Sequence, residues 1–373
     1  MPPNPKVLAL MSHALPPATG AISLLIPGRD TKIAWRNAMN SAEIIRMVVN
    51  VGKTLGFEGG RVPLRELVDR CYATGPFPSV WLVEGLGHYY ADLWYERNEV
   101  PKDALTDPQL HDLPAKSMTM LHAGIGLSIA HQTLLKVPPN SSHEEYCKSV
   151  RQIVELCKQS SRAGYTGAAL ESLGLVARNF HGLAVMKAVH RALTEVDPDS
   201  GGYLWRGAGR AVYFSAPNFI PGWRTPWRAM ALTQREPPDE NGRRNMRAGF
   251  AWAATVVNMR HPIVMETILK YHGAELSADD AFSNGVMSSL IMRYDTSPDD
   301  PNIERFCSYR PASSDLKVVG WWNRLVKAPA EKALKEYYPV LKETNHLEEV
   351  FRYQDLAKLV RRLKASAIQP GWE

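Results

Sequence analysis

Apolar residues recur at helical spacing along most of this 373-residue chain, and no other feature restricts its fold as strongly. No stretch alternates apolar and polar residues with the period of two that a half-buried strand shows. The sequence therefore predicts an all-α fold. Helices are expected over roughly 40–55, 64–72, 81–95, 116–136, 143–161, 278–293, 316–326, 330–338 and 353–366.

The first part of the chain does not share this pattern. Residues 1–35 are rich in Pro and Gly, which predicts an extended arm. Asn40 and Ser41 then precede an apolar run, and both residue types are typical of a helix N-cap. The first helix is therefore expected to begin at about residue 40.

A glycine pattern occurs twice. The segment from Glu84 to His88 reads Glu-Gly-Leu-Gly-His, and the segment from Arg206 to Arg210 repeats its small-residue spacing. Gly124 has a similar counterpart at Gly249. This order predicts two tandem helical repeats, residues 36–140 and 141–275, packed as one compact body and followed by a C-terminal helical segment, 276–373. The Pro-rich stretch 217–238 is the expected loop insertion in the second repeat.

Charge and hydropathy exclude several classes of protein. The formal net charge is +6, but no run of five like charges occurs, so nucleic-acid binding is not expected. No stretch has the 18 or more apolar residues of a membrane-spanning helix. Prolines and glycines interrupt the apolar stretch 7–27 before a secretion signal is complete. The four cysteines show no CxxC pair and no histidine at zinc spacing, which favours reduced thiols in a cytoplasmic protein.

The repeats suggest an acid–base site. On one helix, Glu84, His88 and Asp92 would share a face. In the repeat alignment Glu84, His88 and His122 correspond to three guanidinium groups, those of Arg206, Arg210 and Arg247. If the repeats face each other, a carboxylate or imidazole could move a proton while the arginines hold an anionic or carbonyl group.

Two other interpretations of these residues stay open. Glu84 and Asp92 could form buried ion pairs with the arginines that hold the halves together. Glu84, His88 and His122 could instead be metal ligands, although no spacing identifies further ligands. Four aromatic residues beside them are candidates for the wall of an apolar pocket, or for ordinary core: Trp81, Tyr89, Trp205 and Trp252.

Two acidic runs invite comparison with magnesium–diphosphate chemistry. Asp279-Asp280 and Asp299-Asp300 each precede an expected helix, where carboxylates act as caps. Helix capping is therefore the preferred interpretation. Because no phosphate-binding glycine loop, dinucleotide fingerprint, nucleophile elbow or HExxH motif is present, neither a cofactor nor a metal is expected.

The glycine motifs also carry a resemblance. Glu84 to His88, His122 to Gly126, Gly164 to Glu171 and the closing Phe351 to Asp355 resemble the bacterial domain-of-unknown-function family encoded beside enediyne polyketide synthases, the UnbL-like proteins. The resemblance covers roughly residues 50–357. The resemblance implies a role in specialised-metabolite assembly, acting on a polyene or polyketide-derived intermediate. It does not identify catalytic residues in this chain. The arginines of the second repeat and the N-terminal arm depart from the family pattern.

These observations lead to one hypothesis with two alternatives. The chain is expected to be a cofactor-independent cyclase or isomerase that binds an apolar, unsaturated substrate between the repeats, with Glu84 or His88 and His122 transferring protons. The first alternative is a non-catalytic protein that holds such an intermediate in the same pocket. The second is a non-canonical, metal-dependent terpene cyclase. Homo-oligomerisation is left open by the sequence.

Overall fold

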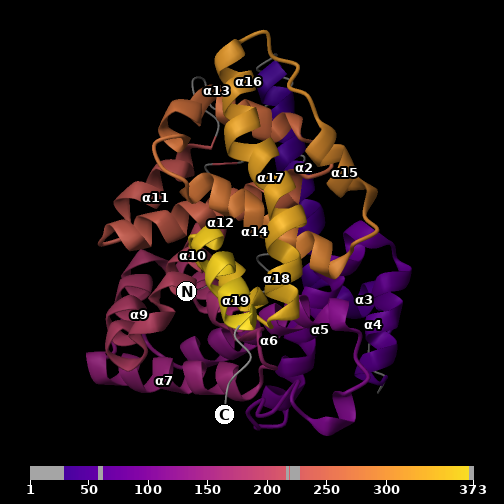
Figure 1. Ribbon diagram of the computed structural model, residues 1–373. Helices are drawn as coiled ribbons and strands as arrows, with labels where there is room; N and C mark the ends of the chain where they lie inside the picture. Colours follow the sequence, from indigo (N-terminus) through magenta and orange to yellow (C-terminus); the bar gives the residue numbers. More distant parts are fainter. Residues whose placement is uncertain (1–28, 58–61, 216–217, 219–226, 369–373) are drawn as a thin grey trace.

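The computed structural model describes residues 29–57, 62–215, 218 and 227–368 (Figure 1). Every regular element within these ranges is a helix, and none is a strand. The all-α class is thereby confirmed. No helix of the described residues is both long enough and apolar enough to cross a membrane.

Six inner helices pack against one another in chain order. They are largely buried, and every residue of the second one except Gln132 is buried. A helix that is apolar on all sides belongs in the interior of a protein. The six are α5 (Pro76–Glu96), α6 (Met118–Leu134), α8 (Thr166–Val176), α10 (Gly201–Tyr213), α12 (Glu240–Asn258) and α14 (Ala281–Thr296).

From α6 onward, outer helices alternate with the inner ones along the chain. In α10 and α12, Gly202 lies against Asn245, and Tyr213 bonds to Asn258 near the other end, so these neighbours run in the same direction. The chain must therefore return between them. The outer helices are α2 (Arg29–Val49), α3 (Val51–Leu55), α4 (Leu64–Ala73), α7 (His143–Gln159), α9 (Gly182–Val196), α11 (Leu232–Arg235) and α13 (Ile263–Leu276).

The C-terminal segment covers α14 and α13. Its long helical run is seen in orange to yellow in Figure 1 and contains two π-helical turns, η7 (Asn323–Lys327) and η8 (Ala333–Tyr337). The α-helices here are α15 (Pro301–Ser308), α16 (Leu316–Trp322), α17 (Ala328–Lys332), α18 (Tyr338–Glu343) and α19 (Leu356–Ile368). A third π-helical turn is η3 (Ala177–His181), and the 3₁₀ turns are η1 (Pro108–Leu110), η2 (Ala115–Ser117), η4 (Pro198–Ser200), η6 (Arg228–Ala231) and η9 (Leu347–Phe351).

The start of the first described helix differs from the expectation. Helix α2 begins at Arg29, so residues 29–35 are helical rather than part of an extended arm, whose residues 1–28 lie outside the described ranges. Asn40 and Ser41 are not caps but lie inside α2. Asn40 Nδ2 donates to Asn258 Oδ1 at 2.9 Å, and the Ser41 hydroxyl donates to the Asn37 carbonyl, so both polar groups are satisfied within the core. Of the stretch 217–238, residues 217 and 219–226 are also outside the described part, and the rest includes η6 and α11.

Glycine allows the inner helices to approach closely. A Cβ atom added to Gly124 on α6 would lie 2.0 Å from the Glu84 carbonyl oxygen on α5. One added to Gly249 on α12 would lie 1.9 Å from the Arg206 carbonyl oxygen on α10. The two helix pairs that the sequence aligns therefore make the same glycine contact. Duplication of the whole unit stays a prediction.

We expect Gly124→Ala to lower the free energy of unfolding by about 1–3 kcal/mol or more, because the backbones of two helices must separate. Gly320→Ala is the matched control, since Gly320 lies in exposed helix with nothing near its added Cβ. That variant should gain about 0.5–1 kcal/mol from helix propensity. Urea unfolding of both variants measures the difference, and equal values would contradict the close packing of α5 and α6.

Candidate functional site

A cavity of about 360 Å³ opens between α2, α3, α5, α6 and the end of α8. Its wall is mainly apolar, with a small number of ionisable side chains. This is the usual composition of a site for a small organic molecule. The apolar side chains include Val48, Val51, Leu127, Val176 and Phe180, and the ionisable ones are Lys53, His88, Tyr89, Asp92 and His131.

A histidine–aspartate pair lies on the α5 side of this cavity. His88 Nδ1 is 3.3 Å from Asp92 Oδ2, one helical turn further on, as their spacing predicts. Helix α6 holds the carboxylate: Ser128 Oγ donates to Asp92 Oδ1 at 2.6 Å and Gln132 Nε2 donates to it at 3.1 Å. Both side chains line the cavity and are part-exposed, so Asp92 can orient the His88 ring for proton transfer to a ligand there.

His131 supplies a second imidazole on the α6 side. Burial, followed by the nearby His88, lowers its pKa to about 4, so the ring is neutral near pH 7. Its Nδ1 has no hydrogen-bond partner among the described residues, and its ring packs edge-on against Phe180 at 5.3 Å between centroids. A neutral imidazole at the wall of the cavity is suited to accept a proton from, or bond to, a bound molecule.

The π-helical turn η3 forms part of the cavity wall near His131. Val176, just before this turn, and Phe180 within it both line the cavity. The turn ends at His181, and α9 begins at Gly182, whose φ of 85° is readily adopted only by glycine. Single π-helical turns are frequent at functional sites because they redirect side chains out of the regular helical pattern.

Glu84 does not line the cavity but belongs to a buried ion-pair network. Its Oε1 is 3.0 Å from Arg210 Nη2, and Glu171 Oε2 on α8 is 2.6 Å from Arg210 Nη1. Glu171 Oε1 also pairs with Arg206 Nη1 at 3.3 Å. The Arg210 guanidinium packs on the Trp252 ring at 4.5 Å. Two carboxylates thus balance two guanidinium groups in the interior.

Charge balance sets the ionisation of the two arginines. Burial lowers the pKa of Arg206 to about 10, against the opposing effect of Glu171. Burial also acts to lower the pKa of Arg210, but Glu171 and Glu84 together raise it well above its usual range. Both groups are therefore cations at neutral pH, and their pairing connects α5, α8 and α10.

The predicted residue His122 is also internal. Nδ1 lies 2.6 Å from the Met118 carbonyl, Nε2 accepts from the Arg162 backbone N–H at 3.0 Å, and the ring stacks on Tyr165. Both ring nitrogens are thus used by the protein in one neutral tautomer. Burial lowers the pKa of His122 to about 4. This histidine has no nitrogen left for a substrate.

The remaining predicted residues are dispersed. Arg247 pairs with Asp279 at 2.5 Å, and Trp205 Nε1 donates to His190 Nδ1 at 3.2 Å. Trp81 is buried against Phe77. Of the ten predicted site residues, His88 and Tyr89 line the cavity. Glu84, His88 and His122 do not form a metal-binding group in the described part of the chain.

The acidic runs are engaged in helix capping and ion pairs. Asp300 accepts from the Asn302 backbone N–H and pairs with Arg293. Asp279 accepts from the Ala281 backbone N–H while it pairs with Arg247, whereas Asp280, the N-cap residue of α14, makes no side-chain cap bond. The preference for capping over magnesium binding thus agrees with the contacts of these aspartates.

Sequence reasoning missed two important residues. Glu171 is the only charged residue of α8. A carboxylate in an otherwise apolar helix needs a buried partner, so the sequence could have predicted an ion pair at this residue. His131 follows the second glycine motif on α6, but nothing in the sequence places it opposite His88. A scan against protein-family models and comparisons with curated proteins and with solved structures gave no match.

Proposed function

We propose that the His88 cavity is the active site of a cofactor-independent acid–base enzyme that isomerises or cyclises a small apolar, unsaturated molecule. The observation that carries the proposal is the His88–Asp92 pair, oriented by Ser128, at the wall of a mainly apolar cavity. His88 transfers the proton, Asp92 orients its ring, and His131 is the second acid–base group. This assignment keeps His88 from the sequence hypothesis and gives Glu84 and His122 structural roles.

The substrate class follows from the cavity and from the resemblance to the UnbL-like proteins. Aliphatic and aromatic walls favour a hydrocarbon-like ligand, and Lys53 at the rim offers a cation for a carbonyl or carboxylate group. A polyene or polyketide-derived intermediate of specialised metabolism combines these features. The terpene cyclase alternative is less favoured, because Asp279 and Asp300 already serve arginines and helix ends.

Solvent deuterium provides a test that does not require the product to be identified first. The protein is incubated in D₂O with a panel of conjugated polyenes and polyenones, and mass spectrometry measures deuterium at carbon. We expect incorporation with the wild type and a rate about 10²–10⁴-fold lower with His88→Gln, because that variant cannot transfer the proton. His111→Gln, a change of an exposed histidine that does not line the cavity, is the matched control and should retain the rate.

The second candidate function is that of a non-catalytic carrier, which the apolar wall of the cavity also favours. Native mass spectrometry of the same samples distinguishes the two functions. Bound but unchanged polyene, without deuterium in any protein sample, would support the carrier. A His88→Gln variant that exchanges as fast as the control would refute the acid–base proposal.

A further inference from the structure

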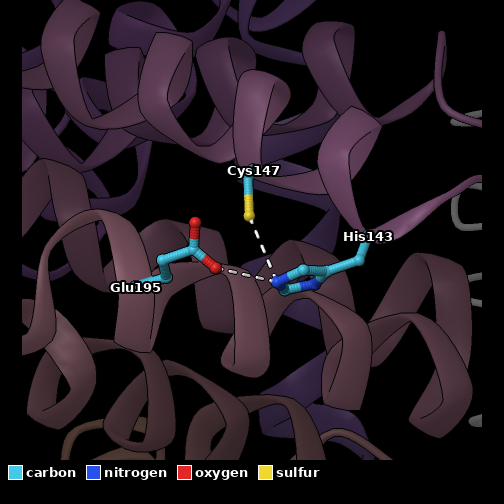
Figure 2. A group of neighbouring side chains, drawn as sticks. All are labelled: His143, Cys147 and Glu195. Carbon is cyan, nitrogen blue, oxygen red and sulfur yellow. Dashed lines mark hydrogen bonds and ion pairs between the residues drawn. The ribbon is translucent and has the colours of Figure 1, made fainter.

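Three potential metal ligands meet on the surface formed by α7 and α9. His143 and Cys147 are one turn apart on α7, and Glu195 lies in the last turn of α9. Figure 2 shows the thiol and the carboxylate directed at the same ring nitrogen of His143. Sγ of Cys147 is 3.5 Å and Oε2 of Glu195 is 3.0 Å from His143 Nε2, and the three ligand atoms lie within 4.8 Å of one another.

We propose that His143, Cys147 and Glu195 bind a zinc ion. Zinc bonds of about 2.0–2.1 Å to nitrogen and 2.3 Å to sulfur, at a tetrahedral angle, place N and S roughly 3.6 Å apart and N and O roughly 3.3 Å apart. The observed separations of 3.5 Å and 3.0 Å are within a few tenths of an ångström of these values. The third pair, Cys147 Sγ and Glu195 Oε2, lies within 4.8 Å, and side-chain rotation brings it to the roughly 3.5 Å that a shared zinc ion requires.

Local structure fixes the positions of the two ligands on α7. Ser142 caps α7 through a capping box with Glu145, so the helix begins at His143. Residues four apart then lie on one face, which directs the Cys147 thiol toward the imidazole. Cys147 is itself buried, whereas the side chains of His143 and Glu195 are more than half exposed. Solvent zinc can therefore reach the imidazole and the carboxylate.

The charges of the three ligands also favour a cation. The Glu195 carboxylate and the Cys147 thiol lie within 4.8 Å of each other. A carboxylate beside a thiol is an unfavourable setting for a thiolate alone, but a divalent cation between them stabilises both anions. Zinc would thus bind with release of the thiol proton. Cysteine, histidine and carboxylate together are a ligand set that zinc accepts.

The consequence is a link between two outer helices with one coordination position left for water or an anionic ligand. None of the three residues lines the His88 cavity, so the site is independent of the proposed acid–base chemistry. It also differs from the sequence expectation of no metal, which rested on the absence of an HExxH motif, of a CxxC pair and of a histidine at zinc spacing from a cysteine. The sequence shows the His-x₃-Cys spacing of the two residues on α7. It does not show that Glu195 lies beside them, because this depends on the packing of α7 on α9.

Cobalt, a spectroscopic substitute for zinc, tests the site directly. Titration of the reduced full-length protein with Co²⁺ is expected to give a thiolate-to-cobalt charge-transfer band that saturates near one ion per chain. Cys147→Ser should abolish the band. Cys307→Ser, the matched control at a part-exposed cysteine outside the cluster, should retain it.

Zinc itself gives the second measurement. Equilibrium dialysis against micromolar Zn²⁺, followed by elemental analysis, should show one ion bound to the wild type and to Cys307→Ser. We expect at least tenfold weaker binding to Cys147→Ser and to Glu195→Ala. The proposal is overturned if the wild type gives no charge-transfer band, or if Cys147→Ser binds zinc as tightly as the control. An ion held by surface histidines alone would produce the latter result.

Discussion

Replacing Glu171 with alanine is expected to lower the free energy of unfolding by about 3–5 kcal/mol, enough to unfold a domain of ordinary stability. Glu171 is fully buried and pairs with both Arg206 and Arg210. Its removal leaves Arg206 buried without a carboxylate partner and leaves Arg210 with Glu84 alone. A buried charge without its partner loses most of the electrostatic interaction that offset its desolvation.

A matched control is available on the surface. Glu240 also pairs with two arginines, Arg243 and Arg244, but its side chain is 58% exposed. Glu240→Ala should therefore change the free energy of unfolding by less than about 1 kcal/mol. Urea denaturation of both variants measures the contrast, and thermal unfolding replaces it if the Glu171 variant is only partly folded. Equal effects of the two substitutions would contradict the structural role of the network.

The milder variant Glu84→Gln separates the two interpretations of Glu84. Arg210 keeps Glu171 in this variant, so we expect a smaller loss of stability than for Glu171→Ala, with deuterium exchange retained. The result would assign Glu84 to the structural network. If the variant instead keeps full stability and loses exchange, Glu84 transfers protons, and the assignment of the active site to the His88 cavity is wrong.

Local features of this structure could be predicted from sequence. The spacing of His88 and Asp92 placed them on one face of a helix, and they do interact there. The Asp299-Asp300 run was interpreted as a helix cap, and Asp300 has that role. Such features depend on residues within one or two turns of each other, where helix geometry alone determines the neighbours.

Contacts between helices were harder to predict. The arginines were expected to face Glu84, His88 and His122 as one group, yet Arg210 meets Glu84 while Arg206 meets Glu171. If one helix is shifted along its neighbour by one turn, about 5.4 Å, the ion-pair partners are exchanged. The glycine spacing in the sequence does not specify this relative position of the helices. His88 and His122 also point into different surroundings, a cavity and the core. Their separation depends on which helices cover each face, and this information is not local.

Acidification is expected to destabilise the protein strongly between about pH 6.5 and pH 4. His122 and His131 each have a pKa near 4 in the folded protein, compared with about 6.5 in an unfolded chain. In this window the unfolded chain binds more protons, so the free energy of unfolding falls as the pH falls. Each of the two histidines contributes a slope of about 1.4 kcal/mol per pH unit. Burial also lowers the pKa of His181, His190 and His261, which act in the same direction.

Substitution of one buried histidine should reduce this pH dependence. His131→Gln keeps a polar side chain that does not titrate, so the slope of unfolding free energy against pH should fall by about 1.4 kcal/mol per unit. Urea denaturation at several pH values from about 4.5 to 6 measures the slope, with His111→Gln as the exposed control expected to retain it. An unchanged slope in His131→Gln would mean that this imidazole binds protons alike in the folded and the unfolded chain. Burial would then not keep it neutral below about pH 6.5, and its proposed role as a proton acceptor beside His88 would be limited to higher pH.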